Sequence, residues 1–347
     1  MKRFLCLFLC LVMLSTLSGC GTTKYTDYSF DYFDTVTTII GFEKDKATFD
    51  RICAEIKREL SVYHRLYNIY NKYNGINNLA SVNQTTGGEH TTVSVDAKII
   101  NLLSFANDMY NTTNGKLNVA FGSVLNVWHQ HREEGINNPP SATLPSFDVL
   151  KNAAEHTDIN NMVLDAEKST VYLRDPQMRL DVGAVAKGYA VEQVALWMKS
   201  KGYTGYILNV GGNVRCVGRR ADGEKWKVGI ENPDTDDDDK PYIEYLLLED
   251  MSLVTSGSYQ RFYVVDGKNY HHIIDPSTLM PGENFLSVSV LTKSSALADA
   301  LSTALFTMSF EDGFSLVAKT DGVEAMWVMP NGEQKYSEDF KKYCSDK

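Results

Sequence analysis

The stretch DVGAVAKGYA, residues 181–190, places an acid, two glycines and a lysine at the start of a predicted helix. Gly183 lacks a Cβ, so its backbone can turn tightly or approach a ligand closely. The first turn of a helix has unpaired N–H groups and the positive end of the helix dipole, which favour a phosphate. Lys187 adds a positive charge, and Asp181 offers a carboxylate to a ribose hydroxyl, a flavin N–H or an amine. Taken alone, the stretch is equally typical of an amphipathic helix that begins at a glycine.

Apolar periodicity on both sides of this stretch predicts a mixture of helices and short strands. Helices are expected over residues 47–67, 97–110, 147–154, 184–201, 295–308 and 310–319. Strands are expected over residues 28–42, 162–164, 170–173, 206–210, 213–217, 226–230, 243–248, 252–255, 261–265, 285–291 and 324–329. Residues 133–145 are polar and contain prolines, which predicts a surface loop. The mixture is neither regular β-α alternation nor all-β, so it predicts an α+β (mixed α/β) fold.

The N-terminus predicts export. Lys2 and Arg3 precede an apolar run, residues 4–14, that is too short to span a bilayer. The following Leu-Ser-Gly-Cys, residues 17–20, matches a bacterial lipoprotein cleavage signature. We therefore expect a signal peptide over residues 1–19, a lipidated Cys20 and a tether over residues 20–27, with the body held at the extracytoplasmic face of the cell membrane. The alternative is a plain secretory peptide in which Cys20 is incidental.

Charge and cysteine content exclude several classes of protein. The net charge of −10 and the lack of a basic stripe argue against nucleic acid and against electrostatic adhesion to anionic lipid. The cysteines of the body, Cys53, Cys216 and Cys344, are scattered singly, which predicts neither a metal cluster nor a disulfide framework.

Two groups of residues have the chemistry of a site. Asp299 and Thr303 lie four apart on a predicted helix, so they share a face, and their oxygens suit a hard cation such as Mg²⁺. The alternative is that Asp299 caps or salt-bridges and Thr303 bonds to its own helix. His271 and His272 alternate along a strand, so only one of them can face a site, where it could relay a proton or bind a phosphate.

Six segments, in this order, resemble the ApbE family of flavin transferases. They are GKLNVAFGSVLNVW (115–128), NVGGNVRCVG (209–218), WKVGIENP (226–233), TSGSYQRFY (255–263), YHHIIDP (270–276) and SVSVLTKSSALADALSTALF (287–306). The resemblance runs from about Phe33 to Val328. It implies one catalytic domain over residues 28–335, built on a mixed, largely antiparallel sheet with flanking helices, and a charged tail over residues 336–347.

The resemblance also implies the activity of an FAD:protein FMN transferase. FAD would bind with its pyrophosphate on Mg²⁺, held by Asp299, Thr303 and the backbone carbonyl of Ala184. A Thr or Ser hydroxyl of an acceptor protein would attack the phosphorus on the riboflavin side, and AMP would leave. The implied catalytic residues are His272, Asp299 and Lys187. The implied FAD contacts are Phe33, Tyr73, Lys116, Leu117, Asn118, Asp181, Lys187, Ser256, Gly257, Tyr259, His272 and Ile274.

The sequence departs from the family pattern at Leu117 and Asn118, where the family has Phe-Asp. Asn118 is an amide in place of a carboxylate, which leaves its contact with the cofactor open. Two other functions also stay open. One is an FAD pyrophosphatase that uses water as the nucleophile and releases FMN and AMP. The other is a flavin-binding lipoprotein without chemistry. The expected partner is a separate redox protein with a Thr/Ser flavinylation motif at the same membrane surface.

Overall fold

A computed structural model describes residues 21–84, 92–234 and 239–345 of the chain. The predicted signal peptide, residues 1–19, and Cys20 lie outside the described residues. Eight strands form the central sheet in the order β1-β2-β6-β7-β10-β13-β14-β15, and every pairing is antiparallel. The strands are β1 (Thr23–Tyr32), β2 (Thr35–Glu43), β6 (Tyr206–Val210), β7 (Asn213–Val217), β10 (Ser252–Gly257), β13 (Ser287–Thr292), β14 (Glu324–Val328) and β15 (Gln334–Tyr336). The predicted α+β class is confirmed.

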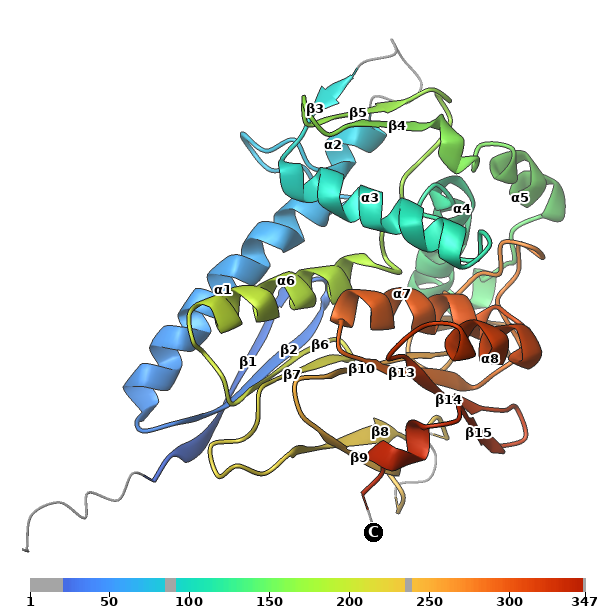
Figure 1. Cartoon of the computed structure of the whole chain (residues 1–347). Coiled ribbons are helices and arrows are strands. Elements are labelled where there is room, and N and C mark those ends of the chain that lie inside the picture. Colours follow the sequence, from blue (N-terminus) through green and yellow to red (C-terminus); the bar gives the residue numbers. More distant parts are fainter. Residues whose placement is uncertain (1–20, 85–91, 235–238, 346–347) are drawn as a thin grey trace, which may run out of the picture.

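Helices cover one face of this sheet (Figure 1). They are α1 (Lys46–Tyr67), α6 (Ala186–Ser200), α7 (Ser295–Phe306) and α8 (Phe310–Ala318). Polar side chains cap the start of three of them: Asp45 accepts from Thr48 N at α1, Ser294 accepts from Leu297 N at α7, and Ser309 accepts from Asp312 N at α8. The apolar faces of α1, α6 and α7 meet the sheet in the main hydrophobic core, which fixes α6 and α7 side by side above β7 and β10.

A hairpin and the end of the chain cover the opposite face. They are β8 (Trp226–Glu231), β9 (Tyr242–Leu248) and a short 3₁₀ helix, η3 (Phe340–Tyr343). Phe340 is fully buried in this second core, and the backbone of Cys344 forms an isolated antiparallel β-bridge with Leu246 of β9. The segment predicted as a charged tail, residues 336–347, is therefore packed against the body as far as it is described.

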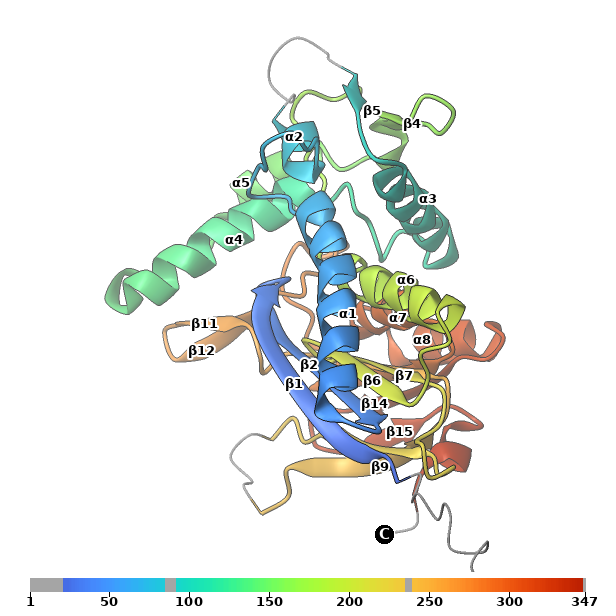
Figure 2. The same cartoon turned by 90° about the vertical axis from the view of Figure 1, so that its left-hand side faces the viewer.

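The remaining elements stand on the helical side and project from it (Figure 2). They are α2 (Leu79–Asn83), β3 (Val93–Ser94), α3 (Ala97–Thr112), α4 (Gly122–Asn137), η1 (Pro139–Ser141), α5 (Phe147–Ala154), η2 (Ile159–Asn161), β4 (Met162–Asp165), β5 (Thr170–Leu173), β11 (Phe262–Val265) and β12 (Lys268–His271). A third, smaller core joins α4, α5 and the β11–β12 hairpin. Within the described residues, no helix is both long and apolar enough to cross a bilayer.

The structure corrects four local predictions. The strand expected over residues 28–42 is a hairpin, because β1 and β2 are joined by a turn at Phe33 and Asp34. β1 begins at Thr23, so it occupies most of the segment predicted as a tether. α4 was not predicted as a helix, and it continues to Asn137, into the predicted loop over residues 133–145. The short elements α2, β12 and β15 were not predicted, since each is too brief to show a period.

Candidate active site

Residues 181–190 form a turn and the first residues of α6. This part of α6 packs closely against α7. Gly188 N donates to Asp299 Oδ2 at 2.7 Å. Val185, in the N-cap position of α6, has a side chain that cannot accept a hydrogen bond. A carboxylate from the neighbouring helix therefore satisfies one of the free N–H groups of the first turn of α6.

A second contact one turn along holds the same two helices together. Glu192 Oε2 accepts from Ser295 N, at the start of α7, at 2.7 Å and from Arg215 Nε at 3.3 Å. Arg215 is fully buried on β7 and also reaches Asp250. Gly188 and Glu192 of α6 thus face Asp299 and Ser295 of α7, so the position of Asp299 is fixed by two polar contacts between the helices.

Asp299 is a buried carboxylate, 3% exposed. Burial raises its pKa, while Lys187, the N–H of Gly188 and the side chain of Asn213 act in the opposite direction. Lys187 Nζ lies 3.7 Å from Asp299 Oδ1 and 3.5 Å from the Gly183 carbonyl, so it connects the turn before α6 with α7. Such a carboxylate is costly to bury unless another positive charge or a set of donors faces it.

Other oxygen atoms gather beside Asp299. Thr303 Oγ1 lies 3.3 Å from the Asp299 carbonyl and 3.4 Å from Ser256 Oγ, at the end of β10. Asn213 Oδ1 is buried and has no hydrogen-bond partner among the described residues. The predicted Asp299–Thr303 pair therefore lies at the junction of α6, α7, β7 and β10.

The turn at residues 181–184 is held from within. Asp181 Oδ1 accepts from Gly183 N at 2.8 Å, and Asp181 N donates to the Val119 carbonyl at 2.8 Å. Burial raises the pKa of the Asp181 carboxyl, and the charges of His129, Arg132 and Arg179 oppose this effect. The second oxygen of the carboxylate is available to a ligand donor.

A cavity of about 140 Å³ opens beside this turn. Predicted and unpredicted residues line it together. They include Phe33, Asp34, His64, Tyr70, Asp181, Gly183, Lys187 and Arg261. The structure thus brings Phe33, Asp181 and Lys187 to one cavity from segments that are far apart in the sequence.

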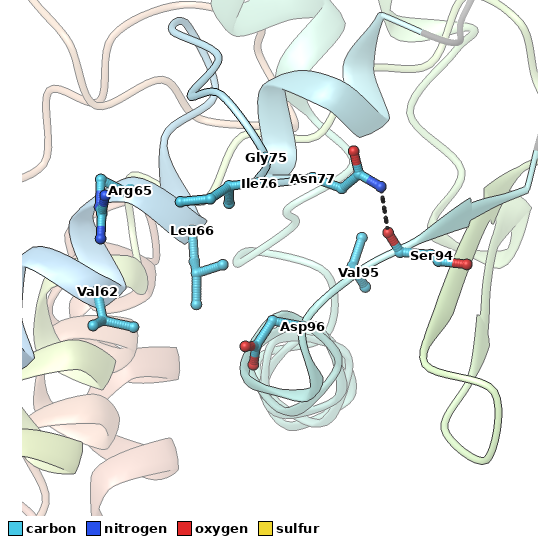
Figure 3. A pocket seen from close by; sticks show the side chains of 9 residues that line it. All are labelled: Val62, Arg65, Leu66, Gly75, Ile76, Asn77, Ser94, Val95 and Asp96. Carbon is cyan, nitrogen blue, oxygen red and sulfur yellow. Dashed lines mark hydrogen bonds between the residues drawn. The ribbon is translucent and has the colours of Figure 1, made fainter.

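A larger cavity, of about 350 Å³, is lined by other residues (Figure 3). The C-terminal part of α1, residues 75–77 and residues 94–96, just before α3, line it, and Asn77 Nδ2 donates to the Ser94 carbonyl. It contains none of the predicted site residues. We assign the site to the smaller cavity because the half-buried Asp181 and the cationic Lys187 both line it.

The two adjacent histidines have different environments. His271 is buried against Phe306, and its ring bonds to the Gly282 carbonyl and to Ile273 N. His272 Nδ1 lies 3.3 Å from the Arg261 carbonyl, so Nδ1 carries the proton and Nε2 keeps a free lone pair. Burial, with the charges of Arg261 and Arg132, lowers the pKa of His272 to about 3, which keeps its ring neutral at physiological pH.

Several predicted FAD contacts have partners within the protein. Lys116 Nζ lies 2.8 Å from Asp275 Oδ1. Asn118 donates to the Thr157 carbonyl and accepts from Ala120 N, so its amide shapes the loop before α4. Leu117 and Ile274 are buried, and Gly257 is the last residue of β10. The hydroxyl of Tyr259 donates to Glu231, and the hydroxyl of Tyr73 forms a hydrogen bond with His64.

His64, Arg261 and Asn213 were not predicted as site residues. His64 lies within the apolar pattern of α1, Arg261 lies in the loop before β11, and Asn213 begins β7. Each is placed at the site by tertiary packing, and no local spacing marks it.

The model of the ApbE family matches residues 27–327. The chain belongs to the ApbE family. A relative from Treponema pallidum, named FAD:protein FMN transferase, is 32% identical over 73% of this chain and 71% of its own length. A relative of the same name from Haemophilus influenzae is 28% identical over 100% of both chains.

Solved structures of ApbE proteins have the same fold. The ApbE protein of Thermotoga maritima is 26% identical, with a TM-score of 0.80 over 93% of this chain and 100% of that chain. The flavin transferase ApbE of Vibrio cholerae is 26% identical, with a TM-score of 0.77 over 93% of this chain and 99% of that chain. The sequence resemblance to the ApbE family is therefore confirmed.

Proposed function

We propose that this ApbE-family protein is an FAD:protein FMN transferase. The observation that carries the proposal is the cluster of Asp299, Lys187 and Gly188 between α6 and α7, beside the cavity that holds Asp181. Lys187 lines the cavity, and its positive charge suits a substrate with phosphate groups. The buried Asp299 carboxylate suits such a substrate through a bound cation. The name shared by the curated relatives supports the same activity.

The residues around Asp299 fit a hard divalent cation such as Mg²⁺. The donors proposed are the Asp299 carboxylate, the Thr303 hydroxyl and the Ala184 carbonyl, and all three are oxygens. The described residues contain no group of three His, Cys, Asp or Glu that could hold a metal, but Mg²⁺ usually takes only one or two carboxylates and completes its shell with water and phosphate oxygens. When bound, the cation would withdraw charge from the pyrophosphate.

The protein's own groups then have separate roles in the reaction. Asp181 accepts a hydrogen bond from the flavin nucleotide, and Lys187 neutralises phosphate charge. The acceptor's Ser or Thr oxygen forms a bond to the FMN phosphorus as the bond from that phosphorus to the AMP oxygen breaks. His272 takes the hydroxyl proton at Nε2, where the negative charge of the bound phosphates would raise its low pKa, and AMP leaves with the electron pair of the broken bond.

The decisive experiment combines the mature protein, FAD, Mg²⁺ and a candidate acceptor domain, followed by intact-mass measurement with a chelator control. We expect the acceptor to gain one FMN on a Ser or Thr only when the metal is present. FMN and AMP released without an adduct would indicate a pyrophosphatase. FAD that stays intact with every redox acceptor tried would contradict both enzymatic functions and indicate a flavin-binding protein.

We propose further that Cys20 is lipidated and that the protein is exported and anchored at the extracytoplasmic face of the membrane. The motif at residues 17–20 supports this. Cys20→Ser should move the protein from the membrane fraction to the soluble fraction of expressing cells, since the lipid would be its attachment. A variant that stays with the membrane would exclude the lipid anchor. The expected partner is a redox protein at the same surface.

A further inference from the structure

The turn between β1 and β2 forms part of the cavity wall in an unfavourable conformation. Tyr32 pairs with Thr35, so Phe33 and Asp34 are the two central residues of a hairpin turn. Their φ angles are 55° and 51°. Both angles lie in the left-handed region, which favours Gly, Asn and Asp and is strained for a bulky residue such as Phe. Strain of this kind persists only where the surroundings hold it.

His64 of α1 holds this turn. Phe33 N donates to His64 Nδ1 at 3.0 Å. This side chain therefore provides a partner for a turn N–H that is not part of the hydrogen-bond ladder between β1 and β2. The Phe33 ring also packs edge-on against the His64 ring, with 5.5 Å between centroids. On the other side of the turn, Arg261 Nη2 lies 3.5 Å from the Asp34 carbonyl.

The same contact fixes the tautomer of His64. Because Nδ1 accepts from Phe33, the ring proton is on Nε2, which lies 3.2 Å from the hydroxyl oxygen of Tyr73. Asn68 Nδ2 donates to the same oxygen at 3.4 Å. The Tyr73 oxygen thus accepts from two donors, and its own proton is left for a ligand. Burial lowers the pKa of His64, which keeps the neutral ring that this arrangement needs.

We infer that His64 is a positioning residue for the flavin substrate, which it serves by orienting the Phe33–Asp34 turn through Nδ1 and the Tyr73 hydroxyl through Nε2. This inference rests on the proposed function and on the FAD contacts of Phe33 and Tyr73 that the family resemblance implies; of these two residues, Phe33 lines the cavity. His64 itself lines the same cavity. Its effect should therefore appear in the binding of FAD and far less in the chemical step.

Two substitutions separate the two contacts of His64. His64→Asn keeps an acceptor near the position of Nδ1 and loses the donor to Tyr73, whereas His64→Gln can reach Tyr73 and loses the acceptor for Phe33 N. We expect each variant to raise the KM for FAD roughly five-fold, the effect of about one hydrogen bond, with kcat within about two-fold of the wild type. Combining each with Tyr73→Phe completes the test: this second change should add little to His64→Asn and its full effect to His64→Gln.

His131→Asn on α4 is the matched control, because His131 is a second histidine that bonds to a backbone carbonyl, that of Thr143, outside the cavity. It should leave the KM for FAD unchanged. An unchanged KM in both His64 variants would overturn the inference. So would equal losses of kcat and Tm in both variants with no coupling to Tyr73→Phe, since that result would indicate general destabilisation. Absence of FAD turnover in the wild type would instead refute the proposed function.

Discussion

Asp299→Asn is expected to abolish FMN transfer while it leaves the fold intact. The variant keeps an oxygen that can accept from Gly188 N at the α6–α7 contact, but it loses the negative charge that would bind the cation. We expect the rate to fall by more than about 100-fold, because changing only the groups around a metal's ligands already costs about 10- to 100-fold. The metal-free variant should lose no more than about 1 kcal/mol in its free energy of unfolding, since it no longer buries a carboxylate whose pKa is raised by burial.

The measurement pairs the transfer rate at saturating Mg²⁺ with chemical denaturation of the metal-free protein. Asp108→Asn, an exposed acid on α3, serves as the control and should change neither quantity. Metal-dependent transfer at the wild-type rate by Asp299→Asn would remove Asp299 from the site. A large loss of stability would instead show that the carboxylate serves the fold.

Gly188→Ala is expected to have the largest effect on stability. A Cβ at this position would lie 2.3 Å from Asp299 Cβ and 2.4 Å from the Ser295 carbonyl oxygen. Neither atom is at the end of a flexible side chain, so α6 and α7 would have to separate. We expect a loss of about 3 kcal/mol in the free energy of unfolding, at the upper end of the usual cost of overpacking. Transfer should also be lost, because the separation would break the contact between Gly188 N and Asp299.

Gly282→Ala provides the control for this substitution. Gly282 is also buried, but an added Cβ there would meet its nearest atoms at 3.5 Å, an ordinary van der Waals distance. Thermal and chemical denaturation of both variants would compare the two positions directly. Equal stability of the two variants would refute the close packing of α6 against α7.

Most of the fold could be predicted from the sequence, because most elements have a clear period or cap. α5, β5, β6 and β7 begin and end at the predicted residues. The β1–β2 hairpin was predicted as one strand because its turn contains Phe33 and Asp34 with no glycine to mark it. The whole of α4 was missed, because no side chain among the described residues caps its start and its polar C-terminal residues, with the prolines after them, resemble a loop.

The candidate site divides in the same way. Asp181, Lys187, Asp299 and Thr303 could be found because their spacing lies within single segments and matches a family pattern. His64, Arg261 and Asn213 reach the site from α1, a loop before β11, and β7, and only the packing of the sheet against the helices brings them there. Contacts between residues far apart in the sequence cannot be predicted from local spacing: Gly188 and Asp299 are 111 positions apart.

The length of β1 determines how far the cavity would lie from a membrane to which Cys20 was anchored. The 10 residues of β1, Thr23–Tyr32, lead from just after Cys20 to the turn at Phe33, which lines the cavity. An extended strand of this length measures roughly 33 Å. With a lipid on Cys20, only Gly21 and Thr22 would separate the membrane from the foot of this strand. The rigid hairpin would then act as a spacer that holds the cavity a fixed distance above the bilayer, so the enzyme would select acceptors by how far their target hydroxyl stands from the membrane as well as by the residues around it.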